Sequence, residues 1–377
     1  MNKLKVMTII GTRPEIIRLS RVMVKLDEYV NQKIVHTGQN YDYELNEIFF
    51  DDLETRKPDH FLNIDTSSLG AAVGDIIRKS EQVLKEENPD ALLVLGDTNS
   101  CLAAYMAKRL HIPIYHMEAG NRCFDFNVPE EINRRIIDHI ADFNLVYTEH
   151  ARRHLISEGL PQRRIYLTGS PMNEVLNYCK EKIERSAILK TLNLEANEYF
   201  MVSMHREENV DLPERLQTIL DILKQLEEMY DKQVIVSTHP RTRKRLEALG
   251  ITVDKKRIRF LKPFGFSDYV ALQQKAFCTI SDSGTISEES AMLNFPAITL
   301  RNSMERPEAL DAGTIAITGF DTQSVLESIE IAVSEKKNKI HSNVPLDYQI
   351  PDTLRRVARL IVGTCKLNNQ WQGIVEG

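Results

Sequence analysis

The sequence predicts an α/β protein with two doubly wound domains in series. Short apolar runs typical of β-strands recur along the chain, and longer segments with helical spacing separate them. Most of the short runs are apolar on both faces, as expected for parallel strands that helices cover on each side. The chain of 377 residues also exceeds the usual size of one core and suits two domains of roughly 150 to 200 residues.

Twelve strands are expected, six in each half of the chain. Their ranges are 4–10, 33–38, 91–97, 112–118, 143–148, 164–169, 199–205, 233–240, 257–263, 277–284, 295–300 and 314–319. A turn signal at 168–176 is followed by a charged, weakly apolar stretch, which places the domains at 1–170 and 171–352. The remaining residues, 353–377, carry Leu354, Val357, Leu360 and Ile361 at helical spacing, so we expect a closing helix.

The composition excludes several classes of protein. A net charge of -6, with charges of both signs mixed along the chain, argues against a nucleic-acid binder. The N-terminal apolar run is too short for a signal peptide and no membrane span is visible, so we expect a cytoplasmic protein. Five scattered cysteines without CxxC spacing suggest neither a disulfide framework nor a zinc site. No GxGxxG follows the first strand and no P-loop occurs.

Six polar motifs each follow a predicted strand directly. They are GTRPE (11–15), GDTNS (96–100), HMEAGNR (116–122), MHREEN (204–209), THPRT (238–242) and SDSGTISEE (281–289). Ligands bind at this edge of open α/β sheets, so two such domains facing each other would place the motifs on the walls of one cleft.

The GTRPE motif combines a helix start with an unexpected cation. Gly11 permits a tight turn, Pro14 suits the first helical turn, and Glu15 suits the positive end of the helix. Capping does not explain Arg13, because the helix dipole repels a cation there. We interpret Arg13 as a phosphate ligand. Arg18, one turn later, is equally consistent with ordinary surface charge.

The SDSGTISEE motif allows two interpretations. Donors around Ser283 and Gly284 can hold a phosphate at a helix N-terminus, with Glu288 or Glu289 accepting hydrogen bonds from a ribose. Alternatively, Thr285 and Glu288 form a capping box.

Acidic side chains are the candidates for proton transfer. Asp97, Glu118 and Glu130, the last beside Glu131, lie on successive segments after strands of the first domain. Carboxylates gathered in a partly desolvated site have raised pKa values and can move protons, although each alone is more typical of a cap or salt bridge. His205 is a plausible cation or proton donor. His239 begins a basic cluster that either attracts a diphosphate or coats a helix.

Taken together, these motifs resemble the non-hydrolysing UDP-N-acetylglucosamine 2-epimerase family. The resemblance rests on GTRPE, GDT, EAG, PEE with NR, HREEN, SDSG with EE, and ERPE (305–308), in the family's order from about residue 5 to about residue 320. It implies a glycosyltransferase-B-like fold, with two Rossmann-like domains around a central cleft and the last helix packing back toward the first domain. It also implies a homodimer, a UDP-sugar substrate, and no metal or other cofactor.

The resemblance assigns roles to residues of this chain. Asp97, Glu118, Glu130 and His205 are implied to be catalytic, with His205 and Arg13 also holding the diphosphate. Ser283 and Gly284 are implied to contact phosphate, and Glu289 the ribose. The remaining expected contacts to substrate or UDP are Arg18, Arg122, His239 and Arg306.

The chain departs from the family pattern at four places. Many members have a lysine at Arg18, a run of threonines in place of TNS, a leucine at Asn121, and two glycines where this chain has SGT. These segments resemble the branch that makes UDP-N-acetyl-L-fucosamine from UDP-2-acetamido-2,6-dideoxy-L-talose for capsule and O-antigen. Conversion of UDP-GlcNAc to UDP-ManNAc is the alternative. A glycosyltransferase and a non-catalytic UDP-sugar sensor are alternatives of another class.

Overall fold

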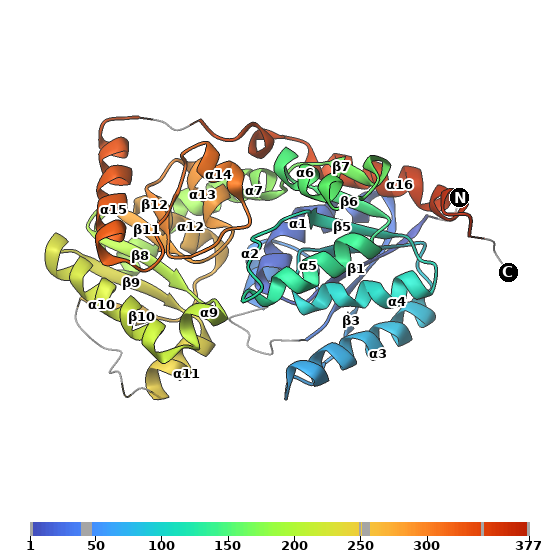
Figure 1. Cartoon of the computed structure of the whole chain (residues 1–377), viewed down its shortest axis with the longest axis horizontal. Helices are drawn as coiled ribbons and strands as arrows, with labels where there is room; N and C mark the ends of the chain where they lie inside the picture. The colour runs from blue at the N-terminus through green and yellow to red at the C-terminus, as the bar shows by residue number, and fades with distance from the viewer. Residues whose placement is uncertain (1–2, 39–46, 249, 251–256, 341–342, 375–377) are drawn as a thin grey trace. The chain divides into compact units, whose positions relative to one another are not determined.

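A computed structural model describes residues 3–38, 47–248, 250, 257–340 and 343–374 (Figure 1). The chain divides into two compact units, which are described separately. Unit 1 comprises Met1–Tyr178 with Leu346–Gly377, and unit 2 comprises Cys179–Pro345. The division falls inside a helix, eight residues after the expected boundary at 170.

Unit 1 contains a seven-stranded parallel sheet in the order β3-β2-β1-β4-β5-β6-β7. Its strands are β1 (Lys5–Ile10), β2 (Asn31–His36), β3 (His60–Phe61), β4 (Ala91–Leu95), β5 (Ile114–Ala119), β6 (Phe143–Val146) and β7 (Ile165–Leu167). Its helices are α1 (Arg13–Tyr29), α2 (Glu47–Asp52), α3 (Leu69–Glu87), α4 (Ala104–Arg109), α5 (Pro129–Ile140), α6 (Glu149–Ser157), α7 (Met172–Arg185) and α16 (Thr353–Trp371), with short 3-10 turns at Asn99–Ala103, Gln162–Arg164 and Leu346–Gln349.

Unit 2 contains a six-stranded parallel sheet in the order β10-β9-β8-β11-β12-β13. Its strands are β8 (Tyr199–Met204), β9 (Gln233–Thr238), β10 (Ile258–Leu261), β11 (Cys278–Ser281), β12 (Ala297–Thr299) and β13 (Ala316–Ile317). Its helices are α8 (Ile188–Leu192), α9 (Glu207–Val210), α10 (Pro213–Tyr230), α11 (Pro240–Ala248), α12 (Phe266–Lys275), α13 (Ile286–Leu293), α14 (Pro307–Asp311) and α15 (Thr322–Lys337).

The two Rossmann-like sheets confirm the predicted fold class. All twelve expected strands are present, and β3 is the additional one. β3 is two residues long and lies at an edge of its sheet, so it leaves no alternating or apolar run in the sequence. Central strands such as β4 are fully buried, because helices cover both faces of the sheet.

The last helix belongs to unit 1. α16 contacts α1, and the Thr353 hydroxyl donates to the Thr168 carbonyl at 2.9 Å. Val357 and Ile361 are buried on one stripe of the helix, whereas Leu354 and Leu360 are only partly buried. In Figure 1 this helix lies beside β7, and Arg356 Nη1 donates to the Leu167 carbonyl at 3.2 Å.

The strand order reverses at one point in each sheet. β1 and β4 are neighbours in unit 1, and β8 and β11 are neighbours in unit 2. Chains leaving such a pair of strands diverge to opposite faces, which opens a place for a ligand at their carboxyl ends. GTRPE and GDTNS follow the first pair, and MHREEN and SDSGTISEE follow the second.

Candidate active site

The turn between β1 and α1 is closed by Glu15. Glu15 Oε2 accepts hydrogen bonds from Gly11 N at 3.0 Å and Thr12 N at 2.7 Å, and Oε1 accepts one from the Ser100 hydroxyl. Burial raises the pKa of Glu15 to about 7, and the hydrogen bonds from Ser100, Thr12 and Gly11 offset part of the rise. The predicted role of Glu15 at the helix start is therefore confirmed.

Arg13 is the first residue of α1 and is partly exposed. Its guanidinium carbon lies 5.8 Å from the centroid of the Phe49 ring. Glu15 accepts from two backbone N–H groups of the same turn, so the role of Arg13 as a phosphate ligand stays a prediction.

Glu118 occupies a β-bulge near the end of β5. Its φ of 62° lies in the left-handed region, and the pairing with β6 shifts register between Met117 and Ala119. A bulge of this kind re-aims one side chain, and a residue other than glycine in this conformation stores strain. Its carboxylate forms a buried ion pair with Arg18, and Oε1 accepts from Asn121 Nδ2 at 3.4 Å.

This geometry decides between the two interpretations of Arg18. The side chain is 5% exposed and its guanidinium is paired with Glu118, so ordinary surface charge is the wrong interpretation. Arg18 instead sets the electrostatic surroundings of a candidate catalytic carboxylate.

Asp97 follows β4, the strand next to β5 in the sheet. Its carboxylate lies 2.7 Å from Arg134 Nη2 and keeps 22% of its side-chain surface exposed. Its backbone carbonyl accepts from Asn133 Nδ2 at 2.9 Å. Arg134 was not among the predicted site residues, although its position one turn after PEE on the expected helix was a usable signal.

The neighbouring acids Glu130 and Glu131 at the start of α5 differ in their surroundings. Glu131 is fully buried and pairs with Arg134 at 3.2 Å and with Arg135 at 2.9 Å. Glu130 is partly exposed on the same helix. Glu131 therefore stabilises α5, and Glu130 remains the candidate of the two for contact with a ligand.

Arg122 lies in a buried ion network. Its guanidinium lies 2.6 Å from both Asp138 Oδ2 and Glu158 Oε2, and it donates to the Asn121 carbonyl at 2.7 Å. Arg122 is 1% exposed. These contacts account for Arg122 as a structural residue, so the substrate contact predicted for it has no support in the geometry.

In unit 2, a buried aspartate organises the chain after β8. Asp282 follows β11 and accepts from His205 N at 3.1 Å and from Arg206 N at 3.0 Å, and His205 Nδ1 lies 3.2 Å from its Oδ1. Burial opposes ionisation, but the charge and hydrogen bond of His205 outweigh it, so the pKa of Asp282 is lowered. Asp282 lies in the SDSGTISEE motif without a predicted role, and in the structure it orients His205.

The turn before α13 brings together the hydroxyl groups of the predicted phosphate site. The Ser283 hydroxyl lies 3.0 Å from the Thr285 hydroxyl, and Ser283 N donates to the Ser281 hydroxyl. Thr285 forms no side-chain cap on α13, and Glu288 pairs with Arg306 at 2.5 Å. The capping-box alternative for Thr285 and Glu288 is therefore wrong.

Glycine is required at position 284. A Cβ built there would lie 2.7 Å from Glu305 Oε1, which is closer than such atoms approach. Glu305 has little freedom to move, because it pairs with Arg206 at 3.1 Å and with Arg301 at 2.6 Å.

The other predicted ligand contacts of unit 2 differ in how exposed their side chains are. Arg306 is 2% exposed and held by Glu288, so its geometry indicates a structural role. Glu289 is buried and accepts from Gln273 Nε2 at 2.8 Å. His239 is partly exposed after β9, and its ring centroid lies 6.4 Å from that of His205.

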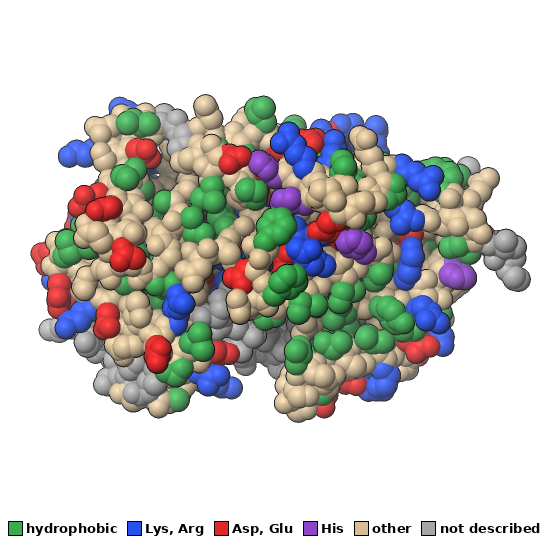
Figure 2. All heavy atoms as spheres, viewed as in Figure 1, with side chains coloured by type: hydrophobic (Ala, Val, Ile, Leu, Met, Phe, Trp, Pro, Cys, Tyr) green, Lys and Arg blue, Asp and Glu red, His purple; other side chains and the backbone are tan. Residues whose placement is uncertain are grey.

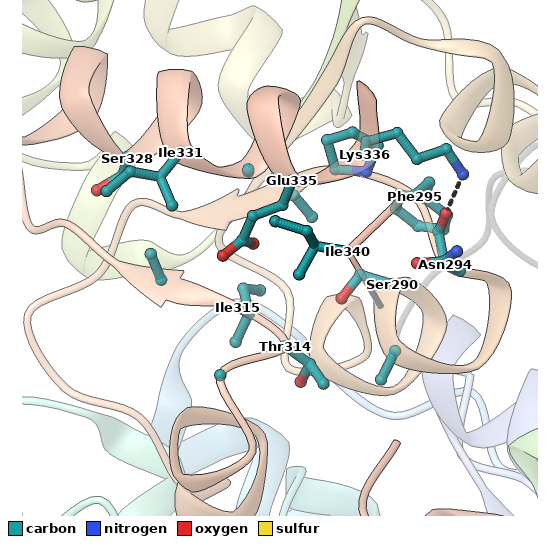
Figure 3. A pocket seen from close by; sticks show the side chains of 16 residues that line it. Ser290, Asn294, Phe295, Thr314, Ile315, Ser328, Ile331, Glu335, Lys336 and Ile340 are labelled. Atoms are coloured by element: carbon teal, nitrogen blue, oxygen red, sulfur yellow. Dashed lines mark hydrogen bonds between the residues drawn. The ribbon is translucent and has the colours of Figure 1, made fainter. Parts of the chain in front are cut away.

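A separate cavity lies in unit 2, away from these motifs. It has a volume of about 250 Å³ and lies between α13, α15 and the segments entering β12 and β13 (Figure 3). Ser290, Ile315, Ile331 and Glu335 are among its lining residues. It is at the amino ends of the strands and contains none of the predicted site residues, so we do not assign the reaction to it.

The described residues contain no cluster of three or more histidine, cysteine or acidic side chains arranged to hold a metal. No helix within the described ranges is long and apolar enough to cross a bilayer. On the visible face, basic and acidic side chains are interspersed (Figure 2).

The fold and the two strand-end sites define a glycosyltransferase-B-like α/β enzyme. A spinosyn rhamnosyltransferase of 10% identity shares this fold, with a TM-score of 0.57 over 95% of this chain and 100% of that chain.

Comparison with known proteins gives the family. The UDP-N-acetylglucosamine 2-epimerase family model matches residues 23–362. A UDP-N-acetylglucosamine 2-epimerase of Methanocaldococcus jannaschii is 36% identical over 89% of this chain and 94% of its own length. The chain therefore belongs to the non-hydrolysing UDP-N-acetylglucosamine 2-epimerase family, whose members are isomerases acting on UDP-sugars.

Other relatives show how the family varies. A solved UDP-N-acetylglucosamine 2-epimerase structure from Rickettsia bellii is 47% identical, with a TM-score of 0.91 over 98% of this chain and 99% of that chain. A Pseudomonas aeruginosa relative, 32% identical over 88% of this chain and 93% of its own, is a UDP-2,3-diacetamido-2,3-dideoxy-D-glucuronate 2-epimerase. The family therefore accommodates more than one sugar.

Proposed function

We propose that the chain inverts C2 of a UDP-linked 2-acetamido sugar by eliminating and re-adding UDP. The observation that carries this proposal is the placement of Asp97 and Glu118. Asp97 follows β4 and Glu118 lies near the end of the neighbouring strand β5, and each is paired with an arginine, Arg134 or Arg18. Two such carboxylates on one sheet edge suit a reaction that needs both a proton acceptor and a proton donor.

The proposed reaction has two half-steps. A carboxylate takes the C2 proton while the bond between C1 and the diphosphate oxygen breaks, which leaves a glycal and UDP. UDP then adds back at C1, and an acid delivers a proton to the opposite face of C2. Arg13, His205, Ser283 and Gly284 are proposed to hold the diphosphate, because charge accumulates there during elimination. Glu289 is proposed as the ribose ligand.

We propose UDP-2-acetamido-2,6-dideoxy-L-talose as the substrate, with UDP-N-acetyl-L-fucosamine for capsule or O-antigen as the product. The support is local to Glu118. Arg18 and Asn121, two departures from the family pattern, both contact its carboxylate. A substrate with a different sugar requires different side chains around C2, the reacting carbon. UDP-GlcNAc is the alternative substrate, which the names of several relatives favour. A homodimer and a cytoplasmic location stay predictions.

The test is incubation of the protein in D2O with each UDP-sugar separately, followed by proton NMR. The proposed reaction places deuterium at C2 and produces the C2 epimer, and it does so faster with the 6-deoxy-L-talo sugar. Faster turnover of UDP-GlcNAc would contradict the substrate proposal alone. Unchanged C2 protons in both sugars would contradict the epimerase proposal.

A variant pair tests the role of the Glu118 neighbourhood. Arg18→Lys combined with Asn121→Leu restores the common family residues, and we expect the kcat/KM ratio of the two sugars to shift toward UDP-GlcNAc by about tenfold. Arg21→Lys is the matched control, because Arg21 lies on the same helix but contacts the Leu53 carbonyl and Thr55. An equal shift of the kcat/KM ratio in the double variant and in Arg21→Lys would remove the support drawn from Arg18 and Asn121.

A further inference from the structure

His116 lies in the middle of β5, fully buried, and bridges two other segments. Its Nδ1 lies 3.0 Å from Asp138 Oδ1, and its Nε2 lies 2.8 Å from the Gly96 carbonyl oxygen. The ring therefore links β5 to the segment of Gly96 on one side and to α5 on the other.

The Asp138 contact belongs to a network of charged groups. Arg122 lies between Asp138 on α5 and Glu158, just after α6, and Arg135 also pairs with Glu158. Burial opposes ionisation of Asp138, but the hydrogen bond and charge of His116, with Arg122, lower its pKa.

The two contacts of His116 reach the segments that carry Asp97 and Glu118. Gly96 directly precedes Asp97, and its φ of 71° permits the turn there. Asp138 accepts from Gly120 N at 3.2 Å, two residues after Glu118. A Cβ on Gly96 would lie 3.7 Å from Glu118 Oε2, so the two segments are already in close contact. Movement of either segment would therefore move a candidate proton-transfer group.

We propose that His116 is a positioning residue that fixes Asp97 and Glu118 relative to each other by bridging the Gly96 carbonyl and the Asp138 carboxylate. The inference rests on the proposed function, because those two carboxylates are the proposed proton-transfer groups. His116 acts on them through the Gly96 carbonyl and through Asp138. Misplacement of reacting groups by about 1 Å can cost about 100-fold in rate, so a bridge of this kind has a measurable effect.

Three substitutions separate the two contacts. His116→Gln places an amide donor near the Nε2 position and keeps the Gly96 contact, whereas His116→Asn places one near the Nδ1 position and keeps the Asp138 contact. His116→Ala removes both. We expect kcat to fall about tenfold in the first two variants and about 100-fold in the third, with the Kd for UDP unchanged.

Asn144→Ala is the matched control. Asn144 is equally buried, pairs with His116 across β5 and β6, and donates to the Asp138 backbone carbonyl at 2.9 Å rather than to its carboxylate. We expect this variant to lose thermal stability comparable to that lost by His116→Ala while keeping kcat within about twofold.

Amide hydrogen exchange tests the inference without a substrate. His116→Ala should speed exchange in segments 96–100 and 118–122, and Asn144→Ala should not. Unchanged exchange there overturns the proposal, as does an equal loss of kcat in Asn144→Ala and His116→Ala. Wild-type protein that turns over neither sugar would instead contradict the proposed function, and the exchange comparison would still decide whether His116 braces the two segments.

Discussion

The two units share one sheet topology but carry different chemistry where the strand order reverses. In unit 1 the groups are two carboxylates, the partly exposed Asp97 and the buried Glu118, each beside an arginine. In unit 2 the carboxylate of Asp282 is buried, and it orients the partly exposed His205. The same scaffold thus presents acids in unit 1 and an imidazole with hydroxyl groups in unit 2.

The N-termini of α1 and α13 also differ in how they are capped. Glu15 caps α1 and accepts from the backbone N–H groups of its turn, whereas Thr285 gives α13 no side-chain cap. α13 also carries acids in its first turn, but Glu288 pairs with Arg306 and Glu289 accepts from Gln273. We therefore propose proton transfer for unit 1 and most of the diphosphate binding for unit 2.

The largest expected effect is that of Asp97→Asn. This variant keeps the shape of the side chain but removes the charge, so we expect kcat to fall about 100- to 1000-fold while UDP binds as before. NMR measures the expected fall in turnover, and calorimetry measures the expected unchanged affinity for UDP. Asp75→Asn, on α3, is the control and should retain full activity. An active Asp97→Asn protein would break the assignment of proton transfer to unit 1.

The next largest effect is expected of Asp282→Asn, which should lower the affinity for UDP, the quantity that Asp97→Asn leaves unchanged. Loss of the carboxylate leaves His205 without its counter-charge, so UDP affinity should fall about tenfold or more. Asp321→Asn is the control, because asparagine also caps helices and Asp321 caps α15 of the same unit. Calorimetric titration with UDP measures both, and unaltered UDP affinity in Asp282→Asn would show that unit 2 does not hold the diphosphate through His205.

Gly284→Ala tests the turn before α13. The added methyl group meets Glu305, which two arginines restrain, so we expect the free energy of unfolding to fall by about 1 to 3 kcal/mol and UDP to bind several-fold more weakly. Gly363→Ala is the matched control, because a Cβ there meets nothing within 4 Å and alanine favours the helix α16. Denaturant titration that finds both variants equally stable would contradict the close approach.

The smallest expected effect concerns pH and Glu15. Its pKa is about 7 in the folded protein and 4.5 in the reference state. A raised pKa contributes stability that is fully present below the unfolded value and is lost as the pH rises through the folded value. Glu15→Gln should therefore lessen the fall in unfolding free energy between pH 5 and pH 8 by about 1 kcal/mol or more. Parallel pH profiles for the two proteins would contradict this.

The sequence was most informative about side chains whose contacts lie within their own segment. Strand residues were predictable because the apolar runs are local, and the helix start at Glu15 because capping spans three residues. Arg18 could not be assigned, since its partner Glu118 lies 100 residues away. Arg122 and Arg306 were predicted as ligand contacts because the motifs contain them, yet buried carboxylates from other segments hold them.

The sequence by itself determined the fold class, the strand-end positions of the motifs, and the family, because periodicity and motif order are written along the chain. Only the tertiary structure decided which charged groups are paired. Asp282 with His205, Arg18 with Glu118, and His116 with Asp138 are contacts between segments that the sheet order brings together. The energy of a charge depends on its neighbours and burial, and neither can be read from sequence spacing.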